Sequence, residues 1–247
     1  MQWLIFRLYG PLASWGGVAV GEVRDSDAHP GKSAVLGLVA AALGIRRDEE
    51  TRLQALNEGY GYAVQVESTG LGITDYHTAQ VPSRSTLKGR PHATRKDELA
   101  MLRDKLNTIL SSRSYRCDAL YRVALWARFE TAQPLSTLAS ALQRPTFVPY
   151  LGRKSCALAL PLEPQLVEAD TLSAALDAAA FASDTLLERD RLRGRRRDRD
   201  SLHWEDDPRI SAGIDSDMTI NRRDGLRSRQ RWQHAPRREH RAFCRED

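Results

Sequence analysis

The stretch Gln2-Trp-Leu-Ile-Phe-Arg-Leu-Tyr9, followed at once by Gly10-Pro11, decides the fold of this chain. Aromatic and aliphatic side chains at strand-like spacing, ended by Gly-Pro, predict a first and largely buried strand. A loop over residues 11–31 follows, and then comes the apolar run AVLGLVAAAL at 34–43. Ser33 precedes this run and Gly44 ends it, which predicts a buried helix with a serine cap and a glycine stop. Strand, loop and helix in this order open many α/β units.

The pattern continues with alternating strands and helices up to about residue 164. The expected elements are a short helix capped by Asp48 and running to 56, a strand at 60–67, a strand at 115–129, an amphipathic helix at 135–142, and a segment at 146–160 that starts as a loop and ends as a strand. The order strand, helix, strand, strand, helix, strand is that of a ferredoxin-like, or RRM-like, domain. The sequence therefore predicts an α+β fold of this kind for residues 1–164.

One insertion interrupts this order, at residues 79–114, between two expected strands. An insertion of this length between neighbouring strands is usually functional or disordered. From Ala79 to Arg116 there are nine Lys or Arg and three Asp or Glu, and residues 97–110 are able to form a helix. We expect a protruding basic thumb at 79–114.

The C-terminal third has a weaker pattern. Residues 165–247 predict a small β-rich subdomain, with a mobile Arg-rich loop near 188–200 that has no periodic apolar residues. From Leu186 to Asp247 there are 17 basic and 13 acidic residues. The combined net charge of this stretch and of residues 79–116 therefore exceeds the net charge of +5 of the whole chain. Basicity confined to two stretches is typical of a surface that faces a polyphosphate.

Several classes of protein are excluded by what the sequence lacks. No apolar run approaches the roughly 18 residues needed to span a bilayer, and the N-terminus has no basic segment or cleavage site, so neither membrane insertion nor secretion is expected. Cys117, Cys156 and Cys244 lie far apart and indicate reduced thiols of a cytoplasmic protein. The six histidines have no metal-ligand spacing and the acidic residues form no paired nuclease motif, so we expect no metal and no cofactor.

RNA binding requires cations for phosphates, flat side chains for bases and backbone amides close to the chain. The sequence supplies each type. The candidate RNA-binding residues are Trp15, Arg24, Lys32, Ser33, Tyr76, His77, Arg84, Lys88, Arg90, Arg95, Lys96, Tyr150, Arg153 and Lys154. For each residue alone, the alternative is an aromatic side chain in the core or a cation on a solvated face.

Two local groups of residues carry more weight than single residues. Pro30-Gly31-Lys32-Ser33 stands at the expected helix start, where free amides and the helix dipole favour phosphate. It lacks the full phosphate-loop pattern, so no nucleotide hydrolysis is expected. The second group, Tyr150-Leu-Gly-Arg-Lys-Ser-Cys156, is a basic turn that leads into an apolar segment, and either a plain β-turn or a phosphate or partner contact explains it.

For catalysis, the best constellation is Tyr76, His77 and Lys88. Metal-independent RNA cleavage needs a base to activate the 2′-hydroxyl and a cation for the developing charge. These residue types are present, but their spacing does not require an active site. A metal-independent endoribonuclease therefore stays open as the alternative to a binding protein.

Five short motifs stand in an order that is specific when they are taken together. They are GPLASWG at 10–16, the Lys32-Ser33 helix with LGL at 36–38 and LGI at 43–45, DYHT at 75–78, YRCDA at 115–119, and PYLGRKSC at 149–156. In these motifs, which cover about residues 1–160, the chain resembles the CasD family, the guide-5′-end subunit of the type I-E CRISPR Cascade complex.

The resemblance implies a non-catalytic RNA-binding subunit. In that family a thumb and the adjoining palm hook the 5′ handle of the CRISPR RNA and contact the neighbouring backbone subunit, and the large subunit docks close by. The expected partners are therefore the handle, the Cascade backbone subunit, the Cascade large subunit and, indirectly, target DNA. A related type I-C branch cuts precursor RNA with Tyr, His and Lys residues, which keeps Tyr76, His77 and Lys88 under consideration. The chain departs from the family pattern after Pro164.

Overall fold

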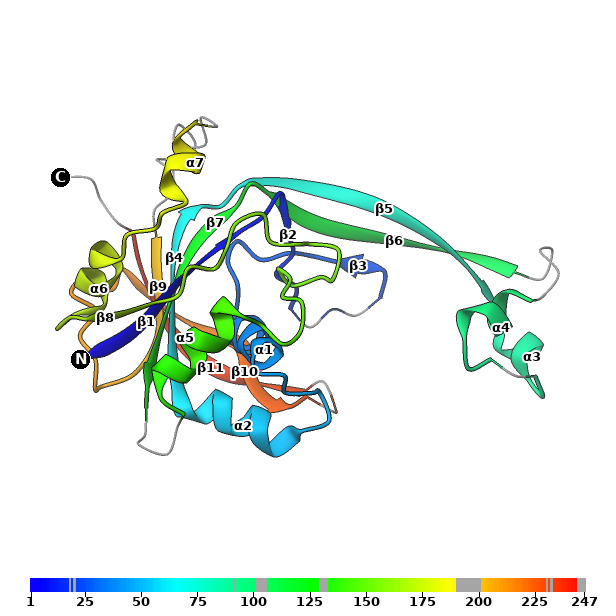
Figure 1. The fold of residues 1–247 in the computed structure, drawn as a ribbon. Coiled ribbons are helices and arrows are strands. Elements are labelled where there is room, and N and C mark those ends of the chain that lie inside the picture. Colours follow the sequence, from blue (N-terminus) through cyan, green and yellow to red (C-terminus); the bar gives the residue numbers. More distant parts are fainter. Residues whose placement is uncertain are drawn as a thin grey trace.

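The computed structural model describes all residues except 18, 20, 91, 101–105, 129–132, 190–200, 230, 232 and 244–247. Its body is built on one seven-stranded sheet (Figure 1). In spatial order the strands are β10 (Met218–Ser228), β11 (Gln233–Phe243), β9 (Ser201–Glu205), β4 (Tyr60–Ser68), β7 (Leu120–Ala127), β1 (Gln2–Tyr9) and β8 (Gln165–Glu168). The chain is therefore a mixed α and β protein with antiparallel sheet pairing, as the sequence predicts.

The helices expected from the apolar patterns are present. They are α1 (Lys32–Ala42), α2 (Glu50–Gly59) and α5 (Leu135–Gln143). The strands expected at 2–9 and 60–67 are also confirmed, as β1 and β4. Neither Ser33 nor Asp48 caps a helix, however, because the N-cap residues are Gly31 and Glu49.

Two strand predictions are wrong. The strand expected at 115–129 is two strands, β6 (Leu106–Cys117) and β7, because Asp118 adopts a positive φ of 55° and turns the chain from one sheet into the other. Residues 146–160, all of which the structure describes, contain no strand and form one isolated bridge between Tyr150 and Ala157. The strand that pairs with the free edge of β1 is β8, which comes later in the chain.

The core lies on both faces of the large sheet. On one face, Leu4, Phe6 and Leu8 of β1 pack with the inward side chains of β7 beneath α1, α2 and α5. On the other, Trp3 and Trp126 meet edge to face, with ring centroids 5.5 Å apart, and α6 (Leu172–Ala178) covers the cluster they belong to. A strand buried on both faces needs apolar residues at nearly every position, which explains the sequence of β1.

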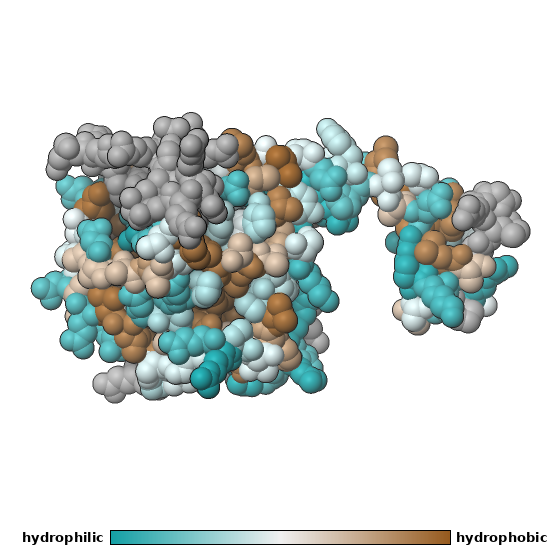
Figure 2. All heavy atoms as spheres, turned by 45° about the horizontal axis from the view of Figure 1, so that its top comes forward, coloured by the Kyte–Doolittle hydropathy of each residue, from teal (hydrophilic) through white to brown (hydrophobic). Residues whose placement is uncertain are grey.

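A long two-stranded ribbon projects from the body (Figure 1). It consists of β5 (Leu71–Pro82) and β6, which pair in antiparallel register from Leu71 opposite Cys117 to Pro82 opposite Leu106. Its tip carries α3 (Arg84–Leu87) and α4 (Arg95–Leu99). We call β5, β6 and this tip the β5–β6 ribbon. Figure 2 shows its tip standing away from the body, with hydrophilic and hydrophobic residues mixed on the surface.

The ribbon corrects the expected thumb in two respects. The projection begins at Leu71 rather than at residue 79. Of the helix expected at 97–110, residues 97–99 belong to α4 and residues 106–110 belong to β6, while 101–105 lie outside the described residues. At the base of the ribbon, β2 (Leu12–Ala13) and β3 (Val23–Arg24) pair with β6 and tie the loop after β1 to it.

The C-terminal third continues the main sheet, since β9 pairs with β4 and β11 pairs with β9. The division at residue 164 stays a prediction. The first two residues of the Arg-rich loop expected at 188–200, Glu188 and Arg189, belong to α7 (Asp184–Arg189), and residues 190–200 lie outside the described part of the chain. Among described residues, Cys117 and Cys156 are free thiols, and Cys244 is not described. No helix in the described ranges has the length and apolar character to cross a membrane.

Candidate nucleic-acid interface

A cleft of about 1010 Å³ lies beside the base of the ribbon. We call it the basic cleft. Its walls come from the loop after β1, from α1, from the turn at 149–153 and from the β10–β11 hairpin. The charged residues that line it are Arg24, Asp25, Asp27, Arg47, Arg153, Arg222, Arg223, Asp224 and Arg229. Six arginines against three aspartates leave a positive balance, which suits a polyanion.

The basic cleft brings together five of the fourteen predicted RNA-binding residues from three separate segments. They are Trp15, Arg24, Ser33, Tyr150 and Arg153. Lys154 lies exposed on the same turn as Tyr150 and Arg153. Three separate segments of the sequence therefore meet on one concave surface.

Trp15 does not offer a free ring. It is buried, with 3% of its surface exposed, and it packs edge to face against Tyr121 with ring centroids 5.7 Å apart. The alternative weighed for single aromatics, a core side chain, thus holds for Trp15. Tyr150 is 43% exposed and is the aromatic side chain on the cleft wall that is open to a ligand.

Arg153 holds the cleft wall together. Its guanidinium donates hydrogen bonds to the carbonyl oxygens of Ser114, at 3.2 Å, and Arg24, at 2.9 Å. It also lies over the ring of Tyr115, 4.6 Å from the centroid. One side chain therefore joins the turn at 149–153, the loop after β1 and the ribbon strand β6.

The turn itself depends on Gly152. Its φ is +86°, and a Cβ at this position would lie 1.8 Å from the carbonyl oxygen of Ser14. Only glycine fits, because the backbone approaches another part of the same chain this closely. The close approach that the sequence suggested for RNA is made here to the loop after β1.

The helix start at Gly31-Lys32 is not open to phosphate. The carboxylate of Asp224 on β10 accepts a hydrogen bond from the backbone amide of Lys32 at 2.9 Å, so a protein carboxylate already occupies the N-terminus of α1. The side chain of Lys32 is buried at 2% exposure, and its Nζ lies 2.9 Å from Glu205. Burial lowers the pKa of Lys32 to about 8, although the charge of Glu205 opposes this shift. Lys32 therefore lies in the interior, paired with Glu205, and does not line the basic cleft.

Sequence reasoning missed the cleft arginines of the C-terminal hairpin. Arg222, Arg223 and Arg229 belong to or follow β10, and Arg47 follows α1. The one signal for them in the sequence is the density of arginine around 222–231, which shows a basic segment but not its place beside the loop after β1. Only the pairing of β10 with β11, and through it with the main sheet, brings these residues beside the loop after β1.

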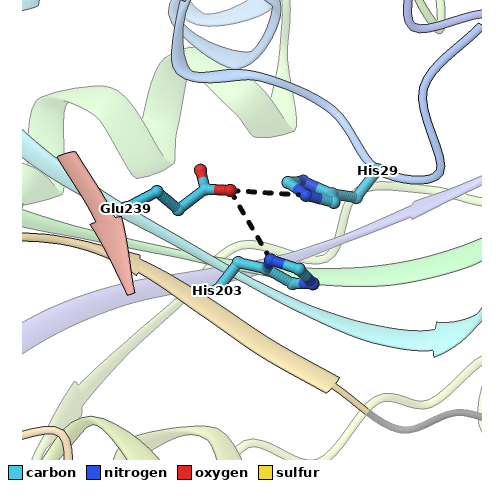
Figure 3. Close-up of side chains that lie close together, drawn as sticks. All are labelled: His29, His203 and Glu239. Atoms are coloured by element: carbon cyan, nitrogen blue, oxygen red, sulfur yellow. Dashed lines mark ion pairs between the residues drawn. The ribbon is translucent and has the colours of Figure 1, made fainter. Parts of the chain in front are cut away.

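His29, His203 and Glu239 form a buried cluster (Figure 3). One carboxylate oxygen of Glu239 lies 3.4 Å from His29 Nε2 and 3.5 Å from His203 Nδ1, and the two imidazole rings stack with centroids 3.9 Å apart. The two ring nitrogens and the carboxylate oxygen lie within 4.8 Å of one another. Arg222 lies 2.7 Å from a ring nitrogen of His29, and Arg237 also pairs with Glu239.

The donor set therefore fits a metal ion poorly, because guanidinium groups already supply the positive charge. Burial alone would raise the pKa of Glu239, yet the hydrogen bond with His203 and the nearby cations hold it well below its ordinary value. Burial and the charge of Arg222 lower the pKa of His29 well below 6.5. The cluster thus joins the loop after β1 to β9 and β11 with a neutral His29 and an ionised Glu239.

The three residues of the catalytic alternative do not converge. Tyr76 and His77 are consecutive in β5, so their side chains point to opposite faces of the ribbon. Tyr76 is 78% exposed, whereas His77 pairs with Asp75 at 2.7 Å. Lys88 follows α3 at the far tip. Cleavage requires the base and the cation to act at the same phosphate, so the three side chains would have to lie on one surface.

The remaining predicted cations lie at the ribbon tip, away from the cleft. Arg84, Lys88, Arg90, Arg95 and Lys96 are all exposed. Arg95 pairs with Glu98 at 2.7 Å and also donates to the carbonyl oxygen of Gln80, which fastens α4 to β5. The predicted site is therefore divided into a cleft part and a tip part.

Comparison with known proteins defines the class of this chain. Residues 3–239 match a family model for CRISPR-associated protein (Cas_Cas5). The chain belongs to this family.

More particular relatives agree with the motifs noted in the sequence. The chain is 36% identical over 170 residues to the CRISPR system Cascade subunit CasD of Escherichia coli (strain K12), which covers 65% of this chain and 69% of the relative. Among solved structures, it is similar to a chain of a CRISPR RNA-guided surveillance complex, with a TM-score of 0.63, 24% identity, and coverage of 98% of this chain and 89% of the other. A structure titled Crystal structure of Cas protein gives a TM-score of 0.60 at 24% identity, covering 98% and 94%. These two likenesses show the shared fold, and the resemblance to the CasD family is confirmed.

Proposed function

We propose that this chain is the non-catalytic subunit that caps the 5′ handle of the guide RNA at one end of a Cascade complex. The observation that carries the proposal is the basic cleft, in which Arg24, Tyr150 and the hairpin arginines meet beside the ribbon. Membership of the Cas5 family supplies the CRISPR context. In this role the chain serves antiviral defence as a cytoplasmic ribonucleoprotein component, without a cofactor.

The concave cleft has the chemistry that single-stranded RNA requires. Arginine side chains suit phosphate because the guanidinium presents paired donors, and an exposed tyrosine offers a face for a splayed base. Arg153 and Gly152 support the proposal indirectly, since they fix the wall on which Tyr150 stands. The RNA therefore lies in the cleft, with Arg24 and Tyr150 on one wall and the hairpin on the other.

The ribbon takes the second part of the role. It exposes Ile73, Tyr76, Ile109 and Leu110 on a two-stranded structure that has no core of its own. Exposed apolar side chains of this kind are typical of a protein contact. We place the neighbouring Cascade backbone subunit against the ribbon and the exposed cations of its tip against RNA, with the large subunit close by and target DNA reached through them.

The proposal also covers the fold, which we interpret as an RRM-like domain with an appended β-rich unit. The antiparallel order β8-β1-β7-β4, with α1 and α5 in the crossovers, supports an RRM-like domain. The ribbon is then the thumb of that domain, inserted between its second and third strands. The three C-terminal strands β9, β10 and β11 represent the appended β-rich unit.

Endoribonuclease activity is the weaker candidate. Since Tyr76 and His77 point to opposite faces of the ribbon and Lys88 lies at its tip, no common phosphate position is available to them. A cut in the precursor RNA is therefore assigned to another protein.

Fluorescence anisotropy with labelled RNA tests the binding role. Titrations of the purified chain with a guide that carries the intact handle, and with an equally long guide whose handle is scrambled, give the two affinities over a salt series. The proposal predicts tighter binding of the intact handle and a steep loss of affinity with salt. Equal affinity for both guides, independent of salt, would contradict it.

A further inference from the structure

The floor of the basic cleft holds two arginines that no motif of the sequence pointed to. Arg47 follows α1, and Arg229 directly follows the last residue of β10. Both line the cleft, together with His234 near the start of β11. Because these residues come from two distant parts of the chain, only the fold places them on one surface.

The position of Arg229 is fixed by contacts between β10 and α2. Asn57 of α2 accepts a hydrogen bond from the amide of Leu226 at 3.2 Å and donates one to its carbonyl oxygen at 3.4 Å. The amide of Arg229 donates to Glu50 at 3.0 Å. A strand edge held in this way presents the Arg229 side chain in a defined place.

The Arg229 side chain lies against α1. A Cβ at Gly37 would lie 3.8 Å from its Nη2 atom, which is an ordinary van der Waals distance. The guanidinium is therefore next to the surface of the helix, where it lines the basic cleft.

The electrostatics of this place favour an anion. Burial and the neighbouring charge of Arg47 lower the pKa of Arg229, and burial and the charge of Arg229 lower the pKa of His234. In addition, the Nδ1 atom of His234 is buried and has no hydrogen-bond partner among the described residues. Like charges that are held together on a partly buried surface destabilise the free chain, and an anion between them removes the repulsion.

We infer that Arg47, Arg229 and His234 form a subsite for one phosphate group of the RNA backbone. The two guanidinium groups supply paired donors to the phosphate oxygens, which a single ammonium group does not. A neutral His234 donates one further hydrogen bond. Tyr150, which lines the same cleft and is 43% exposed, offers its ring to the adjoining base. This subsite rests on the proposed function and gives the RNA a definite anchor on the cleft floor.

The first experiment measures handle RNA binding by anisotropy for wild type and for the double variant Arg47→Gln with Arg229→Gln. Arg238→Gln is the matched control, because Arg238 is an arginine of the same hairpin, 63% exposed and outside the basic cleft. We expect the double variant to bind at least about 10-fold more weakly, and its log-log salt slope to fall by about 0.7 for the loss of one phosphate contact on single-stranded RNA. The control should change neither quantity. Unchanged affinity and slope in the double variant would overturn the subsite.

The second experiment separates the subsite from the proposed function. The thermal midpoint of each free protein is compared in inorganic phosphate and in sodium chloride at equal ionic strength. Wild type should gain more from phosphate than the double variant, because a bound anion stabilises the folded chain. Equal gains would overturn the subsite. Should the double variant not fold, Arg47→Gln alone carries both experiments, since Arg47 is exposed. Failure of wild type to bind handle RNA, with the phosphate effect present, would contradict the proposed function and leave the anion site standing.

Discussion

The carboxylate of Asp224, on β10, accepts a hydrogen bond from the backbone amide of Lys32 at 2.9 Å and so closes the first turn of α1. The same carboxylate pairs with Arg237 at 2.8 Å. Asp224 lies within an irregularity of the β10–β11 pairing, between Arg222 and Gly225, and such bulges re-aim side chains. One residue therefore ties the C-terminal hairpin to α1, which lines the basic cleft.

Replacement of Asp224 by alanine should destabilise the chain strongly. The change leaves Arg237 buried without this partner and the amide of Lys32 without its acceptor, and breaking a buried pair typically costs about 3 to 5 kcal/mol. Chemical denaturation, followed by far-UV circular dichroism, gives the free energy of unfolding.

The matched control is Asp206→Ala. Asp206 pairs with Arg238 at 3.2 Å, but both side chains are exposed, so the loss should be below about 1 kcal/mol. If the two variants lost the same free energy, Asp224 would not hold the helix as described.

Lys32 should give the chain a distinctive stability in mild alkali. The folded chain holds the pKa of Lys32 at about 8, against 10.5 for the unperturbed group. Between these pH values the unfolded chain binds the additional proton, so the free energy of unfolding contributed by Lys32 rises with pH. Urea unfolding at pH 7.5, 8.5 and 9.5 should show this rise in wild type and lose it in Lys32→Met. Parallel pH profiles for the two proteins would show that the buried ammonium is not desolvated.

Gly152 should be intolerant of any side chain. Alanine at this position would meet the carbonyl oxygen of Ser14 in a backbone conformation that favours glycine, so the turn must move and with it the cleft wall that carries Tyr150. We expect a loss of about 2 kcal/mol or more and weaker RNA binding. Gly17→Ala serves as the control for stability, because nothing lies within 4 Å of its Cβ position. A Gly152→Ala protein with wild-type stability and affinity would refute this role of the turn.

The ribbon tip should contribute charge to assembly. Neutralising Arg90, Arg95 and Lys96 together should weaken assembly of the guide-bound complex and flatten its salt dependence, because three exposed cations are lost from the tip. Native gels of the reconstituted complex at about 50, 150 and 300 mM salt measure this effect, because the Debye length shortens over this range of salt.

A triple substitution at Arg52, Arg144 and Arg238 removes the same charge from exposed positions outside the ribbon. It should assemble like wild type. Assembly that withstands salt equally in both triple variants would place the RNA contact elsewhere.

Local patterns predicted the parts of the fold that local chemistry determines. The apolar run of β1, the alternation of β4 and the amphipathic pattern of α5 all appear where the sequence indicated. The break at Asp118 was missed because a non-glycine residue at positive φ leaves little trace in an apolar pattern. The fourth strand was misplaced because β8 has only four residues and its partner on β1 is far away in sequence.

The candidate site was predictable only in part for the same reason. The sequence offered RNA-binding candidates in the motifs at 10–16 and 149–156, but it did not predict that these two motifs meet at the cleft. The interior position of Lys32 depends on Glu205, 173 residues away, and the entry of Arg229 into the cleft depends on Asn57 and Leu226, 169 residues apart. Contacts at such separations follow from sheet order, which a single sequence does not state.

Incubation of the purified chain with a labelled precursor repeat RNA in EDTA, scored for both retention and cleavage, tests the central claim most directly. The account predicts that RNA with an intact handle is retained and is not cut. Specific cleavage that His77→Ala abolishes would contradict it and would make this protein a processing enzyme.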